Sequence, residues 1–333
     1  MSAPYPPDLC LSLLRPTRGR PYSAKAVKEL WGGVKVAPIL PFERAEFVTF
    51  RRESAGRISI SGVQEKISVH LEDGALAPTV RDGRYILKPV PRALAETLEL
   101  VEDVPTNEHV TMQIASQVFG LNVAANGLVF FPGGEPAYIV RRFDHDPTTA
   151  RKLSQEDFCQ LAGRSRQVHG ENYKYTGSYE EIGRLLRQYC PAHRIEAEKL
   201  FAQILFNYIC GNGDAHLKNF SLLESAFGDH LLSPCYDMLC TSLHLPNETR
   251  TALEMFDDFE TESYQRNGFY KRADFLELAA RYGILPKRVE TIMARFQKGR
   301  EAAEVIIARS LLSAQAKERY LSLLRDRLAA VGD

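Results

Sequence analysis

The 333-residue sequence lacks the features that mark several large protein classes. Its six cysteines form no C-x-x-C pair, which argues against a structural zinc site and a disulfide framework. Lysine plus arginine equals aspartate plus glutamate at 42 each, so no global positive charge favours direct nucleic-acid binding. No apolar run approaches the roughly 20 residues of a membrane span, and a signal-peptide pattern is missing. We therefore expect a cytoplasmic protein with reduced thiols and no membrane partner.

Hydrophobic periodicity divides the chain into three parts. Residues 1–50 carry several prolines and one helical pattern, from Ser23 to Trp31, which is typical of a short lead-in. Residues 51–143 alternate in apolar character, which predicts short antiparallel strands with turns at 72–74 and 132–134. They also contain one helical pattern, from Asn107 to Phe119, with a cap at its first residue or the one before. These features predict a small β-rich lobe that binds nucleotide.

Residues 144–333 are mainly helical in pattern, and two long polar segments, 164–177 and 242–266, interrupt them. Loops of that length are more often functional than decorative. Apolar residues at intervals of three and four predict helices over residues 155–161, 179–189, 195–210, 272–282, 286–310 and 314–330. This part is the expected helical catalytic lobe.

The sequence G-D-A-H-L-K-N-F at 213–220 is the most informative stretch. Asp214 and Asn219 have the spacing of the kinase catalytic loop, in which the Asp accepts the proton of the attacking hydroxyl and the Asn holds magnesium. A second metal-binding Asp should follow a short hairpin, and Asp237 lies 18 residues beyond Asn219. A lone histidine is more often structural, so His216 is expected to orient the loop or to contact phosphate. An Asx-rich loop that only caps a helix is the alternative.

Lys88 ends the strand pattern Tyr-Ile-Leu-Lys, the place of the kinase lysine that contacts nucleotide phosphates. That lysine pairs with a glutamate on the lobe's helix, and Glu108 is the available candidate. A solvated lysine and a glutamate stabilised by the helix N-terminus are the alternative. Together with the catalytic loop, the pair predicts an α+β, two-lobed protein kinase-like fold with a small β-rich N-lobe and a larger helical C-lobe.

A loop before the first long strand pattern should cover the phosphates, although it is neither a Walker A motif nor a full G-x-G-x-x-G. Its residues are Ser61, Gly62, Val63, Gln64, Glu65 and Lys66. Phosphorylation of Ser59 or Ser61 would place negative charge beside the nucleotide and repel ATP. Turn-forming serines without such a role are the alternative.

The chain resembles the HipA-like serine/threonine kinases, the toxins of type II toxin–antitoxin modules. The resemblance rests on I-S-G-V-Q-E-K at 60–66, I-L-K-P at 86–89, T-N-E at 106–108, V-R-R-F-D at 140–144, Q-E-D at 155–157, G-D-A-H-L-K-N-F at 213–220 and Y-D at 236–237.

This resemblance implies a protein kinase that uses ATP and Mg²⁺ and autophosphorylates a serine in its own loop, here Ser59 or Ser61. The implied site residues are Asp214 as base, Asn219 and Asp237 as metal ligands, Lys88 and His216 near the phosphates, Tyr236 beside Asp237, and backbone from Arg141 to Phe143 as adenine hinge. Known protein substrates of the family include aminoacyl-tRNA synthetases, whose modification arrests translation and growth and is linked to persistence.

The short lead-in makes the chain similar to the HipT form, in which a separate small protein supplies a missing N-terminal subdomain and can act as antitoxin. A helix-turn-helix DNA-binding protein is the other expected partner. Two alternatives stay open at this point. One is a small-molecule or lipid kinase, and the other is a non-catalytic subunit of an antitoxin-repressor complex.

Overall fold

The computed structural model describes residues 3–54, 65–146, 149 and 151–332. Its internal contacts divide the chain into two compact units. The first unit comprises Met1–Gln113, Ala124–Phe143 and Val305–Lys317, and the second comprises Ile114–Val123, Asp144–Glu304 and Glu318–Asp333. Each unit contains helices and a sheet, so the fold class is α+β, as predicted. The lobe boundaries expected from the sequence stay predictions.

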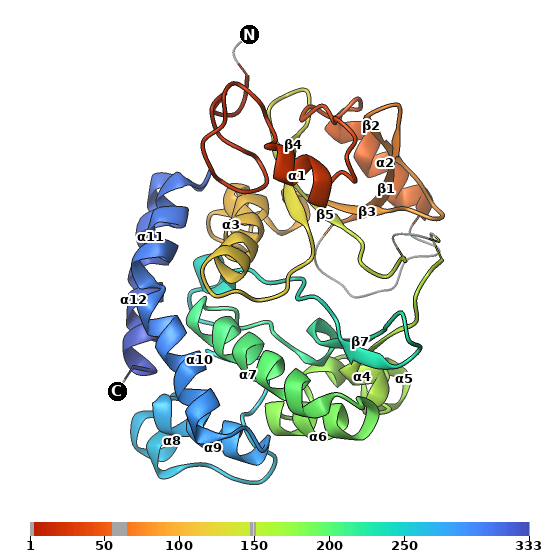
Figure 1. The fold of residues 1–333 in the computed structure, drawn as a ribbon. Coiled ribbons are helices and arrows are strands. Elements are labelled where there is room, and N and C mark those ends of the chain that lie inside the picture. Colours follow the sequence, from red (N-terminus) through yellow and green to blue (C-terminus); the bar gives the residue numbers. More distant parts are fainter. Residues whose placement is uncertain (1–2, 55–64, 147–148, 150, 333) are drawn as a thin grey trace. The chain divides into compact units, whose positions relative to one another are not determined.

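A five-stranded antiparallel sheet organises the first unit, in the spatial order β2-β1-β3-β5-β4 (Figure 1). Its strands are β1 (Ile67–Glu72), β2 (Ala75–Pro78), β3 (Tyr85–Pro89), β4 (Asn126–Phe130) and β5 (Pro136–Arg141). Asp73 and Gly74 adopt φ angles of 49° and 81° between β1 and β2, as a tight hairpin requires. The β4–β5 hairpin turns through Gly134 at φ 90°. The sequence correctly predicts both turns.

The first unit contains α1 (Ala24–Glu29), α2 (Arg44–Ser54), most of α3 (Val104–Gln117), and parts of α11 (Arg300–Arg309) and α12 (Ala314–Ala330). Ser23 caps α1 by accepting the N–H of Ala26, so the short predicted helix is confirmed. The N-terminal segment joins the sheet, because Leu128 N–H donates to Leu11 O (2.9 Å). Trp31 is buried in the same hydrophobic core as strands β1, β3, β4 and β5.

Helix α3 begins earlier than the sequence predicts. The predicted start at Asn107 is wrong, because the helix starts at Val104 directly after a 3-10 turn at Val101–Asp103. Pro105 fits the first helical turn, where a missing N–H is harmless and its fixed φ suits the helix. The predicted stop is correct, since Gly120 follows the helix at φ 65°.

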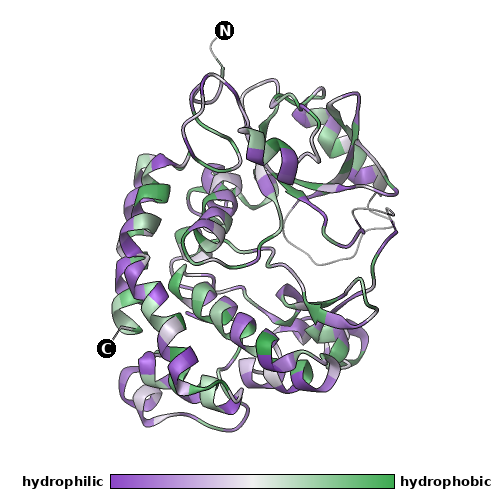
Figure 2. Ribbon diagram, viewed as in Figure 1, coloured by the Kyte–Doolittle hydropathy of each residue, from purple (hydrophilic) through white to green (hydrophobic). Residues whose placement is uncertain are grey.

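The second unit contains a three-stranded antiparallel sheet, β6 (Gln155–Asp157), β7 (Ser221–Glu224) and β8 (His230–Leu232). Helices after residue 144 are α4 (Phe158–Leu161), α5 (Arg166–His169), α6 (Tyr179–Tyr189), α7 (His193–Ile209), α8 (Glu262–Asn267), α9 (Arg272–Arg281), α10 (Pro286–Lys298), α11 (Arg300–Arg309) and α12 (Ala314–Ala330). Both hydropathy colours appear on these helices in Figure 2, as expected of amphipathic helices. From Leu200 onward, α7 is buried on every face and forms the core.

Two segments predicted as single helices differ in the structure because of tertiary contacts. The segment 155–161 begins as strand β6, and Asp157 then caps α4 in a capping box with Gln160. The segment 286–310 is two helices, which meet at Gly299. A Cβ at Gly299 would lie 2.4 Å from the ring of Phe119, so close packing requires glycine there.

The prediction of reduced thiols is confirmed, because all six cysteines are free and buried. No helix within the described ranges combines the length and the apolar character that a membrane span requires.

Candidate functional site

The first unit contains a buried ion pair. Lys88 lies on β3 and Glu108 on α3, and Lys88 Nζ donates to Glu108 Oε1 at 2.6 Å. Their side chains are 2% and 1% exposed. Tyr138, the partner of Lys88 across β3 and β5, places its ring centroid 5.5 Å from the ammonium. Charged residues are almost never this buried unless paired. Strand and helix therefore hold these opposite charges in contact.

The expected phosphate-covering loop lies largely outside the described residues, which include neither Ser59 nor positions 61–64. Glu65 is described, and its buried carboxylate contacts two arginines of α2. Arg44 Nη2 lies 2.5 Å from Glu65 Oε2, and Arg51 Nη1 lies 2.9 Å from Oε1. Lys66 directly precedes β1 and is half-buried. The glutamate thus ties the end of this loop to α2.

The expected adenine hinge begins at Arg141, the last residue of β5. Arg141 N–H donates to Ala125 O (2.8 Å), and its guanidinium donates to Glu29 O (3.0 Å). Arg142 N–H donates to Arg84 O (2.9 Å). Phe143 comes next and is half-buried. The hinge role of this backbone rests on the sequence resemblance.

In the second unit, the loop after α7 is shaped by backbone and amide hydrogen bonds. Gly211 turns the chain at φ 72° directly after the helix cap. Asn212 donates its side-chain amide to Asn207 Oδ1 (2.9 Å) and accepts the N–H of Asp214 at 3.2 Å. These contacts fix the backbone from which the Asp214 side chain projects.

Glycine is required at position 213. A Cβ there would lie 2.5 Å from Thr249 O and 2.6 Å from Cδ of Glu248. Glu248 also accepts hydrogen bonds from Thr241 and Ser242, and Thr241 Oγ1 accepts the N–H of Gly213 at 2.7 Å. Burial raises the pKa of Glu248, although those hydroxyl bonds partly offset the effect. The long segment 242–266 thus supports the loop from one side.

The Asp214 carboxylate receives a hydrogen bond from a tyrosine. Tyr175 Oη donates to Asp214 Oδ1 at 2.5 Å. Burial and this hydrogen bond raise the pKa of Tyr175, so its hydroxyl stays a donor at neutral pH. Its ring lies edge-on to that of His216, with centroids 5.1 Å apart. Tyr175 comes from the other long polar segment, 164–177.

His216 is a buried neutral imidazole. Burial lowers its pKa to about 4, although the negative charges of Asp214 and Asp237 act in the opposite direction. Its backbone N–H donates to Asn219 Oδ1 (3.1 Å). The ring atom Nδ1 is buried and makes no hydrogen bond to any described residue. A buried polar atom without a partner fits a site that a ligand completes.

Asn219 and Asp237 supply oxygen donors in the same unit. The Asn219 amide oxygen accepts one N–H, and a carbonyl oxygen keeps a second lone pair. Asp237 adopts a φ of 52°, a left-handed conformation that is uncommon outside glycine and concentrates at functional sites. Tyr236 Oη donates to Lys218 O (2.7 Å) and so links this segment to the loop.

This donor set fits magnesium. The ion takes oxygen ligands and usually binds through one or two protein groups plus substrate phosphates. Within the described ranges, no cluster of three or more histidine, cysteine or acidic residues forms a closed metal cage. A pair of oxygen donors, Asn219 and Asp237, suits an ion that arrives with a nucleotide.

Sequence reasoning left Lys218 unassigned and did not single out Tyr175, Glu248 or Asp157. Lys218 Nζ contacts Asp157 Oδ2 at 2.8 Å. Burial lowers the pKa of Lys218, but the contact with Asp157 outweighs it and the net pKa is raised. Two of the missed residues, Tyr175 and Glu248, come from the polar segments whose length was the available signal.

Comparisons with known proteins agree with this geometry. Residues 58–303 match the family model described as HipA-like C-terminal domain. A protein of Haemophilus influenzae named as a candidate kinase is 29% identical over 342 residues, with 97% of both chains covered. The serine/threonine-protein kinase toxin HipA of Shewanella oneidensis is 28% identical over 268 residues, which cover 75% of this chain and 58% of that protein.

A solved structure shares the fold. The Shewanella oneidensis toxin–antitoxin complex of HipA, HipB and operator DNA matches with a TM-score of 0.63 at 20% identity. The match covers 88% of this chain and 73% of that one. At this identity the likeness concerns the fold alone.

Proposed function

The chain belongs to the HipA-like C-terminal domain family, and from this membership we propose that it is a serine/threonine protein kinase and the toxin of a type II toxin–antitoxin pair. The reaction is transfer of the γ-phosphate of Mg-ATP to a protein hydroxyl. The buried Lys88–Glu108 pair at 2.6 Å carries the proposal, because protein kinases require this lysine–glutamate contact.

Asp214 is the proposed general base. Oδ1 accepts the Tyr175 hydroxyl, and the carboxylate accepts the proton of the acceptor hydroxyl as its oxygen attacks the γ-phosphorus. The new O–P bond forms while the bond from the γ-phosphorus to the β–γ bridging oxygen breaks, and ADP leaves. Lys88 is the proposed contact to the nucleotide phosphates. His216 stays neutral at pH 7 and offers a hydrogen bond rather than a charge.

Asn219 and Asp237 are the proposed magnesium ligands. Bound magnesium supplies positive charge that neutralises phosphate oxygens during transfer. The left-handed backbone at Asp237 and the tie from Tyr236 to the loop support this assignment, since both hold the carboxylate in a defined place.

The remaining assignments concern the nucleotide's surroundings. Backbone from Arg141 to Phe143 is the proposed adenine hinge, and residues 61–66 are the proposed cover of the phosphates. Ser59 and Ser61 are the proposed autophosphorylation sites, which lie outside the described residues. Modification there would add negative charge and weaken ATP binding.

Partners follow from the relatives. HipA of Shewanella oneidensis was solved with HipB and operator DNA, so we propose that an antitoxin protein binds this chain too. The proposed substrate is a protein hydroxyl, with aminoacyl-tRNA synthetases as the first class to examine.

The test uses Mg-ATP labelled at the γ-phosphate, with and without a pool of aminoacyl-tRNA synthetases. We expect label on the 57–66 peptide or on a synthetase, located by mass spectrometry. Asp214→Asn should reduce transfer by about 10²–10⁴-fold, because it removes the base. Asp258→Asn, an exposed aspartate elsewhere in the same unit, is the matched control and should keep full activity. Equal labelling in both variants would overturn the assignment of Asp214.

A further inference from the structure

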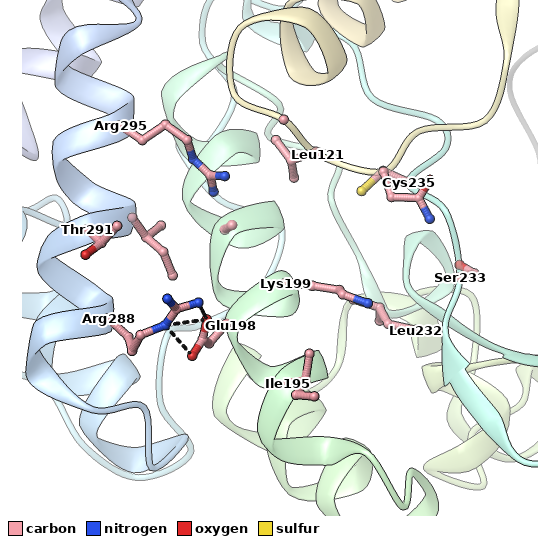
Figure 3. Close-up of a pocket in the computed structure, with 14 residues that line it drawn as sticks. Leu121, Ile195, Glu198, Lys199, Leu232, Ser233, Cys235, Arg288, Thr291 and Arg295 are labelled. Atoms are coloured by element: carbon pink, nitrogen blue, oxygen red, sulfur yellow. Dashed lines mark hydrogen bonds and ion pairs between the residues drawn. The ribbon is translucent and has the colours of Figure 1, made fainter.

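The second unit contains a cavity built from residues with no part in the proposed phosphoryl transfer. Its volume is about 370 Å³, within the range of small-ligand sites. The walls come from the loop at Gly120–Asn122, one face of α7, the end of β8 with the residues after it, and one face of α10 (Figure 3).

The floor of this cavity is apolar. Leu121, Ala202, Leu232 and Ile292 line it, and each is at most 9% exposed. They come from four different parts of the unit, so the floor is fixed by its packing. An apolar chain placed on such a floor loses water-exposed surface, and each buried methylene contributes about fourfold to affinity.

The rim of the cavity is cationic. Lys199 Nζ contacts the buried Glu196 at 2.6 Å, and Arg288 contacts Glu198 at 2.6 Å, so both charges are compensated. Arg295 differs from them, because it makes no ion pair with any described residue. Figure 3 shows it reaching from α10 toward Leu121.

The position of Arg295 is also desolvated in part. A Cβ at Gly120 would lie 3.5 Å from Arg295 Nη1, so the guanidinium lies against the loop backbone. Burial lowers the pKa of Arg295, even though the side chain as a whole is exposed. A guanidinium offers paired N–H donors that match the oxygens of carboxylates and phosphates.

We propose that this cavity binds a small amphiphilic oxyanion, a carboxylate or phosphate monoester on a short apolar chain, with Arg295 holding the charged group. The apolar floor accepts the chain, and Arg295, which has no ion-pair partner among the described residues, accepts the anion. A polar nucleotide does not match this floor, so the site is separate from that proposed for ATP. Nothing in the inference depends on kinase activity.

The experiment titrates the purified full chain with four six-carbon probes by ligand-observed NMR. Hexanoate and hexyl phosphate are the two anions, hexan-1-ol is neutral and hexylammonium is a cation. We expect saturable binding of at least one anion, about tenfold tighter than hexanol, and no binding of hexylammonium. The tighter of the two anions identifies the head group. No saturable anion binding up to about 20 mM, or equal affinity for hexanol, would overturn the proposal.

Matched variants on α10 test whether Arg295 supplies the positive charge that binds the anion. Arg295→Gln should weaken the bound anion about tenfold, whereas Arg295→Lys keeps a cation and should retain much of the affinity. Lys298→Gln removes the same charge from the same helix outside this cavity and should stay within about twofold of the parent chain. If Arg295→Gln does not fold, Arg295→Ala and the probe series on the parent chain give the same comparison. Unchanged anion affinity without the Arg295 cation would refute its role.

Discussion

The two groups of proposed catalytic residues are held in opposite ways. In the first unit, Lys88 and Glu108 compensate one another at 2.6 Å and are almost wholly buried. In the second unit, the Asp214 carboxylate receives a neutral hydroxyl from Tyr175, and no described cation forms an ion pair with it. The first group is electrostatically complete, whereas the second keeps a negative charge.

This difference predicts that mutations in the two groups affect folding stability to different extents. A buried pair that loses one partner leaves a charge in a low-dielectric core, so its integrity matters to folding. The half-buried Asp214 carboxylate receives a neutral hydroxyl, so its removal leaves no opposite charge unpaired and costs the fold little. We therefore expect changes in the first group to lower stability as well as turnover, and changes in the second to act mainly on turnover.

The largest expected effect is on the buried pair. Lys88→Met should lower the free energy of unfolding by about 3–5 kcal/mol, because Glu108 is left buried without its cation. Urea denaturation measures this change. The double variant Lys88→Met/Glu108→Leu should recover most of the loss, since well-packed apolar groups can replace a buried ion pair.

The control is an exposed Lys–Glu pair in the same unit. Lys25 and Glu29 lie 3.7 Å apart on α1 with side chains 65% and 50% exposed. Lys25→Met should change stability by less than about 0.5 kcal/mol. Similar losses at both pairs would contradict the view that burial makes the first group structural.

A pH dependence extends the comparison to His109, the neighbour of Glu108. Burial lowers the pKa of His109 to about 4, from an ordinary value of 6.5, and its ring Nε2 contacts Ser12 O at 2.8 Å. The unfolded chain therefore takes up the proton first as the pH falls below 6.5. Stability should decrease from pH 6.5 down to pH 4, by up to about 3 kcal/mol.

His109→Gln keeps a donor for Ser12 O and removes the titration. Urea melts between pH 7 and pH 4 should therefore show a shallower loss for this variant than for the parent chain. Parallel curves for the two proteins would show that His109 does not contribute to acid sensitivity.

The sequence predicts these two groups unequally well. Strand alternation and helical periodicity are local signals, and they place Lys88 and Glu108 on elements that the structure brings into contact. Tyr175 and Glu248 come from long polar segments without periodicity, so only tertiary packing shows that they surround the loop. Length was the one local signal these segments carried.

Prediction of the fold shows the same contrast between local signals and tertiary packing. Turn residues such as Gly74 mark hairpins correctly because their backbone conformation is a local property. The break between α10 and α11 was missed because Gly299 meets Phe119, which lies far away in the sequence. Pro105 is a local signal for the early start of α3, but the prediction followed the apolar pattern, which begins at Asn107.

A smaller effect is expected where the second unit depends on close backbone packing. Gly213→Ala places a Cβ against Thr249 O and Glu248, which must move, so we expect about 1–3 kcal/mol of destabilisation and reduced turnover. Gly133→Ala is the control, because nothing lies within 4 Å of its Cβ position. Calorimetry compares the thermal stability of the two variants. A Gly213→Ala variant as stable as the control would show that the loop accommodates the added methyl group without cost.

The smallest expected effect concerns Tyr175. Phenylalanine there removes the hydroxyl that fixes Asp214 Oδ1 and leaves the ring beside His216, so stability should change by less than about 1 kcal/mol. Turnover should fall about five- to tenfold, with the KM for ATP unchanged, because the base is less well oriented. Tyr173→Phe, from the same segment, is the control and should match the parent chain. A rise in turnover for Tyr175→Phe would mean instead that the hydroxyl obstructs the acceptor. The Asp214 carboxylate would then need no bonded partner, in contrast to Lys88 and Glu108, which depend on one another.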